Sequence, residues 1–172
     1  MKSDFWLTAK DVLRVNASKW PNKIGAKDLY REFTFKEWNE RACRLANALA
    51  NIGLNKGDRI AVLAYNCVEW MDIYAAAAKG GFIVVPIMFR LSVPEMEYNL
   101  NHSESKVLIV QGGIDKVSGK EFPWINTVNG MKRNLSSVEK YVSFGFDNPH
   151  YDGFISYDDI LSVASPEEPA TK

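Results

Sequence analysis

Three short stretches carry the side chains best placed for chemistry, and each directly follows a predicted buried strand. They are Tyr65-Asn66, Met88-Phe89-Arg90 and Gln111-Gly112-Gly113. Ligands of open parallel sheets bind at the carboxyl ends of the strands, where such stretches meet. A guanidinium there presents a planar pair of donors to phosphate oxygens, so Arg90 is the candidate phosphate contact. The alternatives remain open: Asn66 as a helix cap, Arg90 as a surface cation paired with Glu95 or Glu97, and the glycines as a turn.

A second stretch superficially resembles a phosphate loop. It runs from Gly113 to Gly119-Lys120 and follows a predicted strand. A phosphate loop requires four residues between its glycines, whereas five stand here, and Glu121 occupies the place of the Ser or Thr that binds Mg²⁺. We therefore reject it.

Histidines and cysteines offer no further site. His102 and His150 are isolated, and Cys43 and Cys67 match no metal or redox spacing. We predict no catalytic residue and no metal ligand in this chain. The 21 basic residues equal the 21 acidic ones, which gives no electrostatic footprint for nucleic acid. Without a signal-like N-terminus or cysteine pattern, a cytoplasmic protein is expected.

The elements that must position the three stretches form a repeating pattern. Thr34 and Glu37 make a capping box before a helix that ends at Gly53. Strands are predicted at 59–64, 82–87 and 106–110, helices at 68–79 and 92–102, with N-caps at Asn66 and Ser92. The strands are continuously apolar, which favours a parallel βαβαβ sheet layer covered by helices, in the α/β class.

The flanking regions complete the predicted organisation. A small hairpin is expected at about 23–35, ahead of the α/β unit at about 36–144. A helix at 122–132, a strand at 140–144 and a short helix at 156–164 follow. We assign residues 1–164 to one subdomain, and the Pro-rich, charged residues 165–172 to a linker.

The apolar run from Ile73 to Phe89 raises the question of a membrane segment. It has 17 residues, includes Lys79, and is interrupted by Gly80-Gly81 and Pro86. A membrane-spanning helix needs about 20 apolar residues. The run is therefore interpreted as a buried helix, a turn and a buried strand, and no transmembrane segment is predicted.

Several short sequence motifs occur in the order typical of one enzyme family. They are Phe33-Thr34-Phe35, Ile52-Gly53-Leu54, Gly57-Asp58-Arg59, Asn66, Gly81 to Pro86 and Arg90-Leu91. Through residues 30–110 the chain resembles the N-terminal part of the adenylate-forming acyl-CoA synthetases, of the AMP-binding superfamily. The resemblance identifies the superfamily and leaves the acyl substrate undefined.

The resemblance implies a parent ligase that joins a carboxylic acid to ATP, with Mg²⁺ offsetting phosphate charge, and passes the acyl group to coenzyme A. It implies that Arg90 lies near the entry of coenzyme A. The family's phosphate loop should follow a linker like residues 165–172, where the chain stops. We therefore expect an N-terminal fragment that is inactive alone and binds none of these cofactors.

Two other functions stay open, and one physical consequence follows. The chain could be a stand-alone module that binds a small ligand or partner, or a fragment of an amino-acid adenylation domain. The start at Met1, without a preceding carrier domain, speaks against the latter.

A fragment would expose apolar surface meant for burial, so we expect self-association through Phe122, Trp124 and Ile125.

Overall fold

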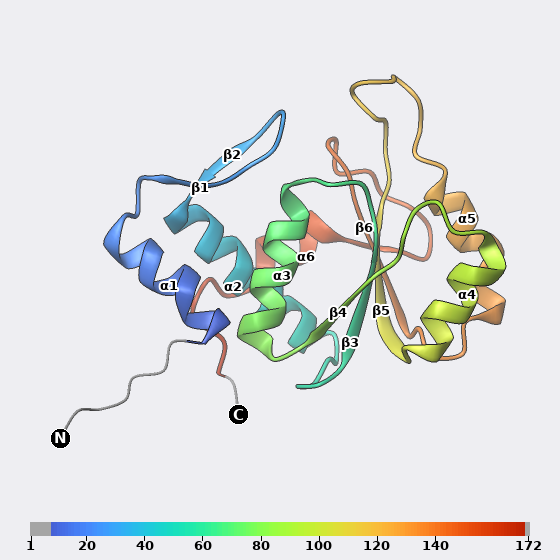
Figure 1. Cartoon of the computed structure of the whole chain (residues 1–172), viewed down its shortest axis with the longest axis horizontal. Helices are drawn as coiled ribbons and strands as arrows, with labels where there is room; N and C mark the ends of the chain where they lie inside the picture. Colours follow the sequence, from blue (N-terminus) through green and yellow to red (C-terminus); the bar gives the residue numbers. More distant parts are fainter. Residues whose placement is uncertain (1–7, 171–172) are drawn as a thin grey trace.

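The computed structural model describes residues 8–170, which form one α/β layer with a small hairpin beside it (Figure 1). In chain order the elements are α1 (Ala9–Lys19), β1 (Ile24–Lys27), β2 (Glu32–Thr34), α2 (Phe35–Asn51), β3 (Arg59–Leu63), α3 (Val68–Gly80), β4 (Ile83–Pro86), α4 (Val93–His102), β5 (Ser105–Gln111), α5 (Trp124–Met131), a 3₁₀ turn (Lys132–Asn134), β6 (Lys140–Phe144), β7 (Ile155–Ser156) and α6 (Tyr157–Val163).

The central sheet confirms the predicted parallel architecture. Its five strands lie in the order β4-β3-β5-β6-β7, and every neighbouring pair is parallel. The predicted hairpin is present as β1 and β2, which pair antiparallel in a separate sheet.

Alternate residues of the central strands enter two different cores. On β3, Ile60 and Val62 pack in the core that α2, α3 and α6 cover, whereas Ala61 and Leu63 pack in the core under α4 and α5. Figure 1 shows these helices on opposite faces of the sheet. Because both faces are covered, the central residues of the inner strands are almost all apolar, and most of the polar ones lie at the strand ends.

Local sequence signals place the helix starts as predicted in two of three cases. The Thr34 and Glu37 side chains form the capping box of α2, and Ser92 with Glu95 does the same for α4. The prediction for Asn66 was wrong. Cys67, and not Asn66, is the residue that precedes the first residue of α3, and its side chain makes no cap hydrogen bond.

The strand after the apolar helix is less buried than predicted. β4 is an edge strand with β3 on one side, and the Ile83 side chain is 51% exposed. The interpretation of 73–89 as wholly buried was therefore wrong for β4. In the described part of the chain, no helix combines the length and apolar character that a membrane crossing requires.

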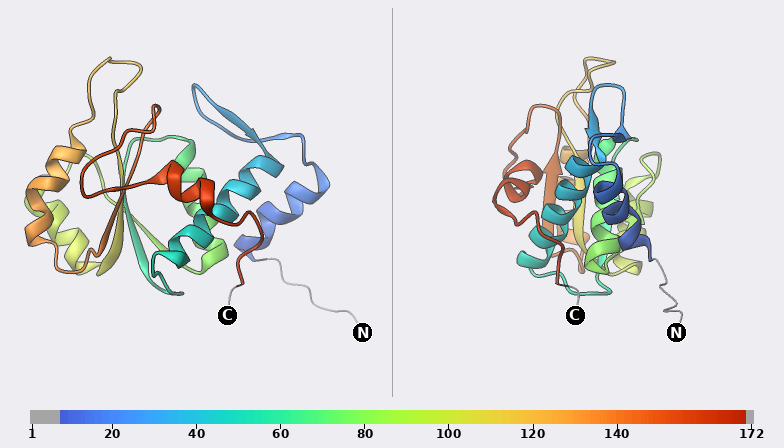
Figure 2. Two further views of the ribbon diagram at one scale, coloured as in Figure 1. Left: turned by 180° about the vertical axis from the view of Figure 1, so that it is seen from behind. Right: turned by 90° about the vertical axis from the view of Figure 1, so that its left-hand side faces the viewer.

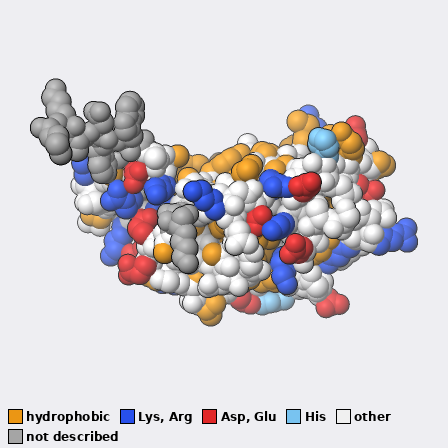
Figure 3. Space-filling view, turned by 90° about the horizontal axis from the view of Figure 1, so that it is seen from below, with side chains coloured by type: hydrophobic (Ala, Val, Ile, Leu, Met, Phe, Trp, Pro, Cys, Tyr) orange, Lys and Arg blue, Asp and Glu red, His pale blue; other side chains and the backbone are white. Residues whose placement is uncertain are grey.

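The residues chosen for self-association are also buried. Phe122, Trp124 and Ile125 pack in the core beneath α4 and α5, with at most 6% of each exposed. Hydrophobic side chains gather elsewhere, in a band over α3, β4 and α4 along the upper edge of Figure 3. Its exposed members include Met71, Tyr74, Ile83, Val93 and Tyr98. Self-association stays a prediction, on a different surface.

Candidate functional site

The three predicted stretches do meet at one edge of the central sheet, which we call the carboxyl edge. The backbone N–H of Tyr65, after β3, donates to Oε1 of Gln111, at the end of β5, over 2.9 Å. The indole N–H of Trp70 donates to the Tyr65 carbonyl oxygen over 3.0 Å. The exits of β3 and β5 are thus held to each other and to α3.

An aromatic cluster joins this edge to the loop after β4. The ring of Tyr65 lies 4.6 Å from that of Phe89 and 4.7 Å from that of Trp124, both edge-on. Phe122 stacks on Trp124 at 5.2 Å. Such pairs add about 0.5–1.5 kcal/mol each beyond area burial. The cluster therefore gives the edge an apolar, largely rigid floor.

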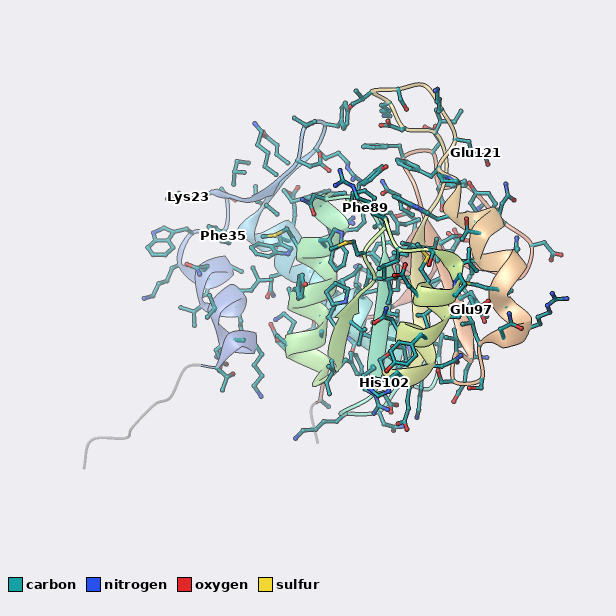
Figure 4. The ribbon with its side chains drawn as sticks, turned by 45° about the vertical axis from the view of Figure 1, so that its right-hand side comes forward. Lys23, Phe35, Phe89, Glu97, His102 and Glu121 are labelled. Carbon is teal, nitrogen blue, oxygen red and sulfur yellow. The ribbon has the colours of Figure 1, made fainter. Side chains whose placement is uncertain are left out.

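Arg90 lies on the rim of this floor with its side chain exposed. Its guanidinium is 5.5 Å from the Phe89 ring, and Figure 4 shows Phe89 at the carboxyl edge. The pairing with Glu95 or Glu97 is not observed. Glu95 accepts from Ser92, and Glu97 accepts from Asn134 at 2.7 Å. Within residues 8–170, no carboxylate forms an ion pair with Arg90.

A cavity of about 190 Å³ opens beside the aromatic cluster. Its walls come from the hairpin tip, the exits of β3 and β5, and the long loop after β5: Asp28, Leu29, Tyr30, Tyr65, Asn66, Cys67, Gln111, Asp115, Val117, Phe122 and Phe146. Aromatic walls with a few amide and carboxylate groups suit one flat or narrow polar group. The cavity takes in two of the three predicted stretches and leaves Arg90 outside.

Close packing explains the glycines of the third stretch. A Cβ on Gly112 would lie 2.6 Å from the ring of Tyr151. Gly113 has a φ of +78° and donates its N–H to the Tyr151 hydroxyl over 2.6 Å. The loop that follows is closed by Asp115, whose pKa is lowered by hydrogen bonds from Ser118 and Val117. No helix begins at Gly119-Lys120, so this loop lacks the form of a phosphate loop.

A cluster of charges anchors the hairpin to α3 under this cavity. Arg31 donates to both carboxylate oxygens of Glu69, at 2.5 and 2.9 Å, and to Asp28 at 2.9 Å. Burial favours the neutral form of Asp28, yet the N–H groups of Tyr30 and Arg31 and the guanidinium lower its pKa overall. The Arg31 guanidinium also lies 4.5 Å from the ring of Phe146. The hairpin wall of the cavity is therefore fixed by bidentate, charge-assisted bonds.

A second, more deeply buried charge on α3 was not predicted from the sequence. Asp72 is completely buried, and its Oδ2 accepts from Nε and Nη2 of Arg41 at 2.9 and 2.6 Å. The hydroxyl of Tyr157 donates to the same oxygen over 3.2 Å, while Oδ1 has no hydrogen-bond partner. Burial raises the pKa of Asp72 to about 6 against the opposing effect of Arg41. The signal was available: Glu69, Asp72 and Lys79 share one face of an otherwise apolar helix.

The histidines and cysteines take no part in the carboxyl-edge chemistry. His102 stacks on Tyr98 at the opposite end of the sheet (Figure 4), and His150 lies 3.8 Å from Asp159. Burial raises the pKa of both thiols, that of Cys43 to about 11, so neither is a reactive thiolate. Among residues 8–170, no three His, Cys, Asp or Glu side chains gather as a metal site would require.

Comparison with known proteins relates the chain to ligases that form acyl-CoA. Fatty acyl-CoA synthetase A of Dictyostelium discoideum is 32% identical over 130 residues, which are 70% of this chain and 20% of that protein. A medium-chain-fatty-acid–CoA ligase of Ectopseudomonas oleovorans is 29% identical over 131 residues, 74% of this chain and 22% of the ligase. The chain thus spans about a fifth of these relatives' length.

Solved structures show the same fold. The anthranilate CoA ligase AuaEII, in complex with anthranoyl-AMP, matches 97% of this chain with a TM-score of 0.83 and 26% identity, over 30% of its own length. The N-terminal domain of FACL13 from Mycobacterium tuberculosis matches 97% of the chain with a TM-score of 0.78 and 28% identity, over 39% of its length. A family model described as AMP-binding enzyme matches residues 13–158. The match covers well over half of the 172 residues, and the chain therefore belongs to the family of AMP-binding enzymes.

Proposed function

We propose that this chain is the N-terminal part of an acyl-CoA ligase that activates a carboxylic acid with ATP and transfers the acyl group from the adenylate to coenzyme A. The observation that carries the proposal is the match of 97% of the chain, at a TM-score of 0.83, to a CoA ligase with an acyl-adenylate bound. The relatives include ligases for fatty acids and a feruloyl-CoA synthase. They differ in their acids, so we propose no acyl chain length.

The role proposed for this part of the ligase is support of the acyl-transfer step. The carboxyl edge offers an aromatic floor with Arg90 on its rim, and no described carboxylate neutralises that guanidinium. Arg90 can therefore hold a phosphate of coenzyme A by paired, charge-assisted hydrogen bonds. The Phe89 ring, 5.5 Å away, limits the directions that the guanidinium takes.

Adenylation itself is not assigned to these residues. The loop from Gly113 to Lys120 is closed on itself by Asp115 and does not present a helix N-terminus to phosphates. The described residues offer no carboxylate cluster for Mg²⁺, and no step through that ion is derived from them. We propose that ATP and Mg²⁺ are bound by the remaining four-fifths or so of the ligase.

The first test uses the purified chain. Residues 1–172 are assayed for pyrophosphate exchange that depends on added carboxylic acids, with heat-treated protein as the control. We expect no exchange above that control. Sustained exchange would show that the chain adenylates a carboxylic acid by itself. The proposal that ATP and Mg²⁺ are bound by the rest of the ligase would then be wrong.

The second test places Arg90→Ala in a full-length ligase that contains this chain. Loss of a charged phosphate contact should raise the coenzyme A concentration needed for half-maximal thioester formation about tenfold, which corresponds to ~1.4 kcal/mol. Pyrophosphate exchange should stay nearly unchanged. The matched control is Arg133→Ala, which removes an exposed arginine from the 3₁₀ turn that precedes β6, away from the carboxyl edge.

The two half-reactions distinguish the outcomes. If exchange and thioester formation fall together, Arg90 supports the fold and does not contact coenzyme A. If neither changes, Arg90 is a solvated surface cation. The two other functions considered from the sequence, a stand-alone binding module and an amino-acid adenylation domain, receive less support, because CoA ligases make up the relatives and structures described above.

A further inference from the structure

The segment that follows α6 is bound to the body of the protein by side chains of α2. We call residues 164–170 the strap. Arg44 donates to the carbonyl oxygen of Ala164 over 2.5 Å, and Asn47 donates to the carbonyl oxygens of Ser165 and Glu167, each over 2.9 Å. Figure 2 shows the segment passing from α6 along α2 on the rear of the molecule. A segment with a linker's composition is thus held in one place.

One side chain of the strap supplies the counter-charge of a buried lysine. Nζ of Lys79, on α3, lies 2.7 and 2.8 Å from the two carboxylate oxygens of Glu168. The Lys79 side chain is 1% exposed, whereas that of Glu168 is 41% exposed. Asn39 on α2 donates to the same carboxylate over 3.3 Å. Within residues 8–170, Glu168 is the carboxylate that pairs with Lys79.

The surroundings of Glu168 favour an anion. A cavity of about 150 Å³ beside it is lined by Lys10, Asp11, Arg14, Lys79, Glu168 and Pro169. Apart from Glu168, Asp11 is the carboxylate among the lining side chains. Asp11 is already bound by Arg14, at 2.9 Å. The neighbouring Asn39 and Cys43 are neutral, so no other wall replaces the charge of Glu168.

Two cavities border the strap at Pro169. Pro169 borders the cavity beside Lys79 and a second cavity of about 350 Å³ on its other side, lined by Ala46, Ala50, Leu54 and Phe82 among others. The carboxylate of Glu168 therefore enters a recess lined by Lys10, Arg14 and Lys79, next to a proline that borders both cavities. The strap is held by the ion pair and by hydrogen bonds from three side chains of α2, Asn39, Arg44 and Asn47.

We propose that Lys79 and Asn39 form a carboxylate-binding site, which Glu168 of the same chain occupies as a latch and which a small free monocarboxylate binds when residue 168 has no carboxylate. The buried ammonium requires one carboxylate, and removing it leaves a buried charge unpaired. A free carboxylate and the strap compete for this site. The position of the strap is thereby linked to the occupancy of the site.

The test is chemical rescue of a latch variant. Glu168→Ala is expected to lower the thermal unfolding midpoint of the purified chain by about 5 °C, because it leaves the buried Lys79 ammonium unpaired, whereas the partly exposed carboxylate reduces the effect below that of a fully buried pair. Sodium acetate or propionate should restore the midpoint with a saturating dependence, because a ligand of the folded state stabilises it by mass action. Sodium chloride at equal ionic strength should not.

Two further variants make the result specific. Glu167→Ala removes the adjacent carboxylate, which forms no ion pair in the described structure, and should unfold like the wild type with no response to acetate. Lys79→Met combined with Glu168→Ala should be more stable than Glu168→Ala alone and insensitive to acetate, since it removes the unpaired ammonium. This double variant also decides the matter if Glu168→Ala does not fold.

Three outcomes would overturn the proposal. A wild-type midpoint in Glu168→Ala would show that Lys79 does not need the latch. Equal responses of Glu168→Ala to acetate and chloride would show that no carboxylate site exists. A double variant less stable than Glu168→Ala would show that Lys79 stabilises the fold by other means.

Discussion

Replacing Asp72 by Asn tests the charge arrangement behind α3 most directly. Two guanidiniums, of Arg31 and Arg41, face three carboxylates, of Asp28, Glu69 and Asp72. The network therefore holds one negative charge in excess: Asp28 and Glu69 share Arg31, whereas Asp72, whose buried Oδ1 has no hydrogen-bond partner, pairs with Arg41. Tyr157 from α6 contributes a neutral hydroxyl. Asn at position 72 keeps the shape of the side chain and removes the negative charge of Asp72.

The magnitude follows from the pKa of Asp72. Burial raises it from 3.8 to about 6. An acid whose pKa is raised in the folded state favours folding most below the unfolded pKa and loses that stability as the pH rises through the folded pKa. A difference of about two pKa units corresponds to ~3 kcal/mol, of which ~1.4 kcal/mol develops between pH 5 and pH 8. The Asn variant lacks this contribution.

The assay is urea unfolding, followed by tryptophan fluorescence, of the wild type and Asp72→Asn at several pH values. The stability of the variant relative to the wild type should increase by about 1.4 kcal/mol from pH 5 to pH 8. Asp147→Asn, at an exposed loop position, is the matched control and should show no such trend. Parallel pH dependences for Asp72→Asn and the wild type would refute the raised pKa of Asp72 in the folded protein.

Two further predictions concern packing and surface. Gly112→Ala should destabilise the chain by about 1–3 kcal/mol, because its Cβ would meet the Tyr151 ring at 2.6 Å, and combining it with Tyr151→Ala should recover much of the loss in the same urea assay; an unchanged single variant would mean that the ring moves freely. Self-association at about 100 μM should be reduced by Tyr74→Lys, in the exposed band over α3, β4 and α4, and not by Val163→Lys on α6, as measured by sedimentation; a strict monomer in the wild type would contradict the expectation.

The sequence alone determined most of the elements and the parallel sheet, because their signals are local, whereas α1 and β7 were not predicted. Thr34 with Glu37 and Ser92 with Glu95 satisfy free amides within one helical turn. The starts of α2 and α4 can therefore be predicted without any tertiary contact. The continuous apolar strands required cover on both faces, which the two cores provide. Parallel order then brought Tyr65, Phe89 and Gln111 to one edge, as predicted. The role of Arg90 at that edge stays a prediction.

Only the tertiary structure decided which groups face one another across long stretches of chain. Asp72 meets Arg41 across 31 residues, and Lys79 meets Glu168 across 89. The charges on one face of α3 are visible in the sequence, but their partners leave no local pattern, because a buried charge is satisfied by whichever element packs over it. The same reason explains two wrong predictions: β4 lies at an edge, and Phe122, Trp124 and Ile125 are buried. An apolar side chain in the sequence indicates that it will be buried. Which neighbour buries it depends on how the helices and the sheet pack in three dimensions.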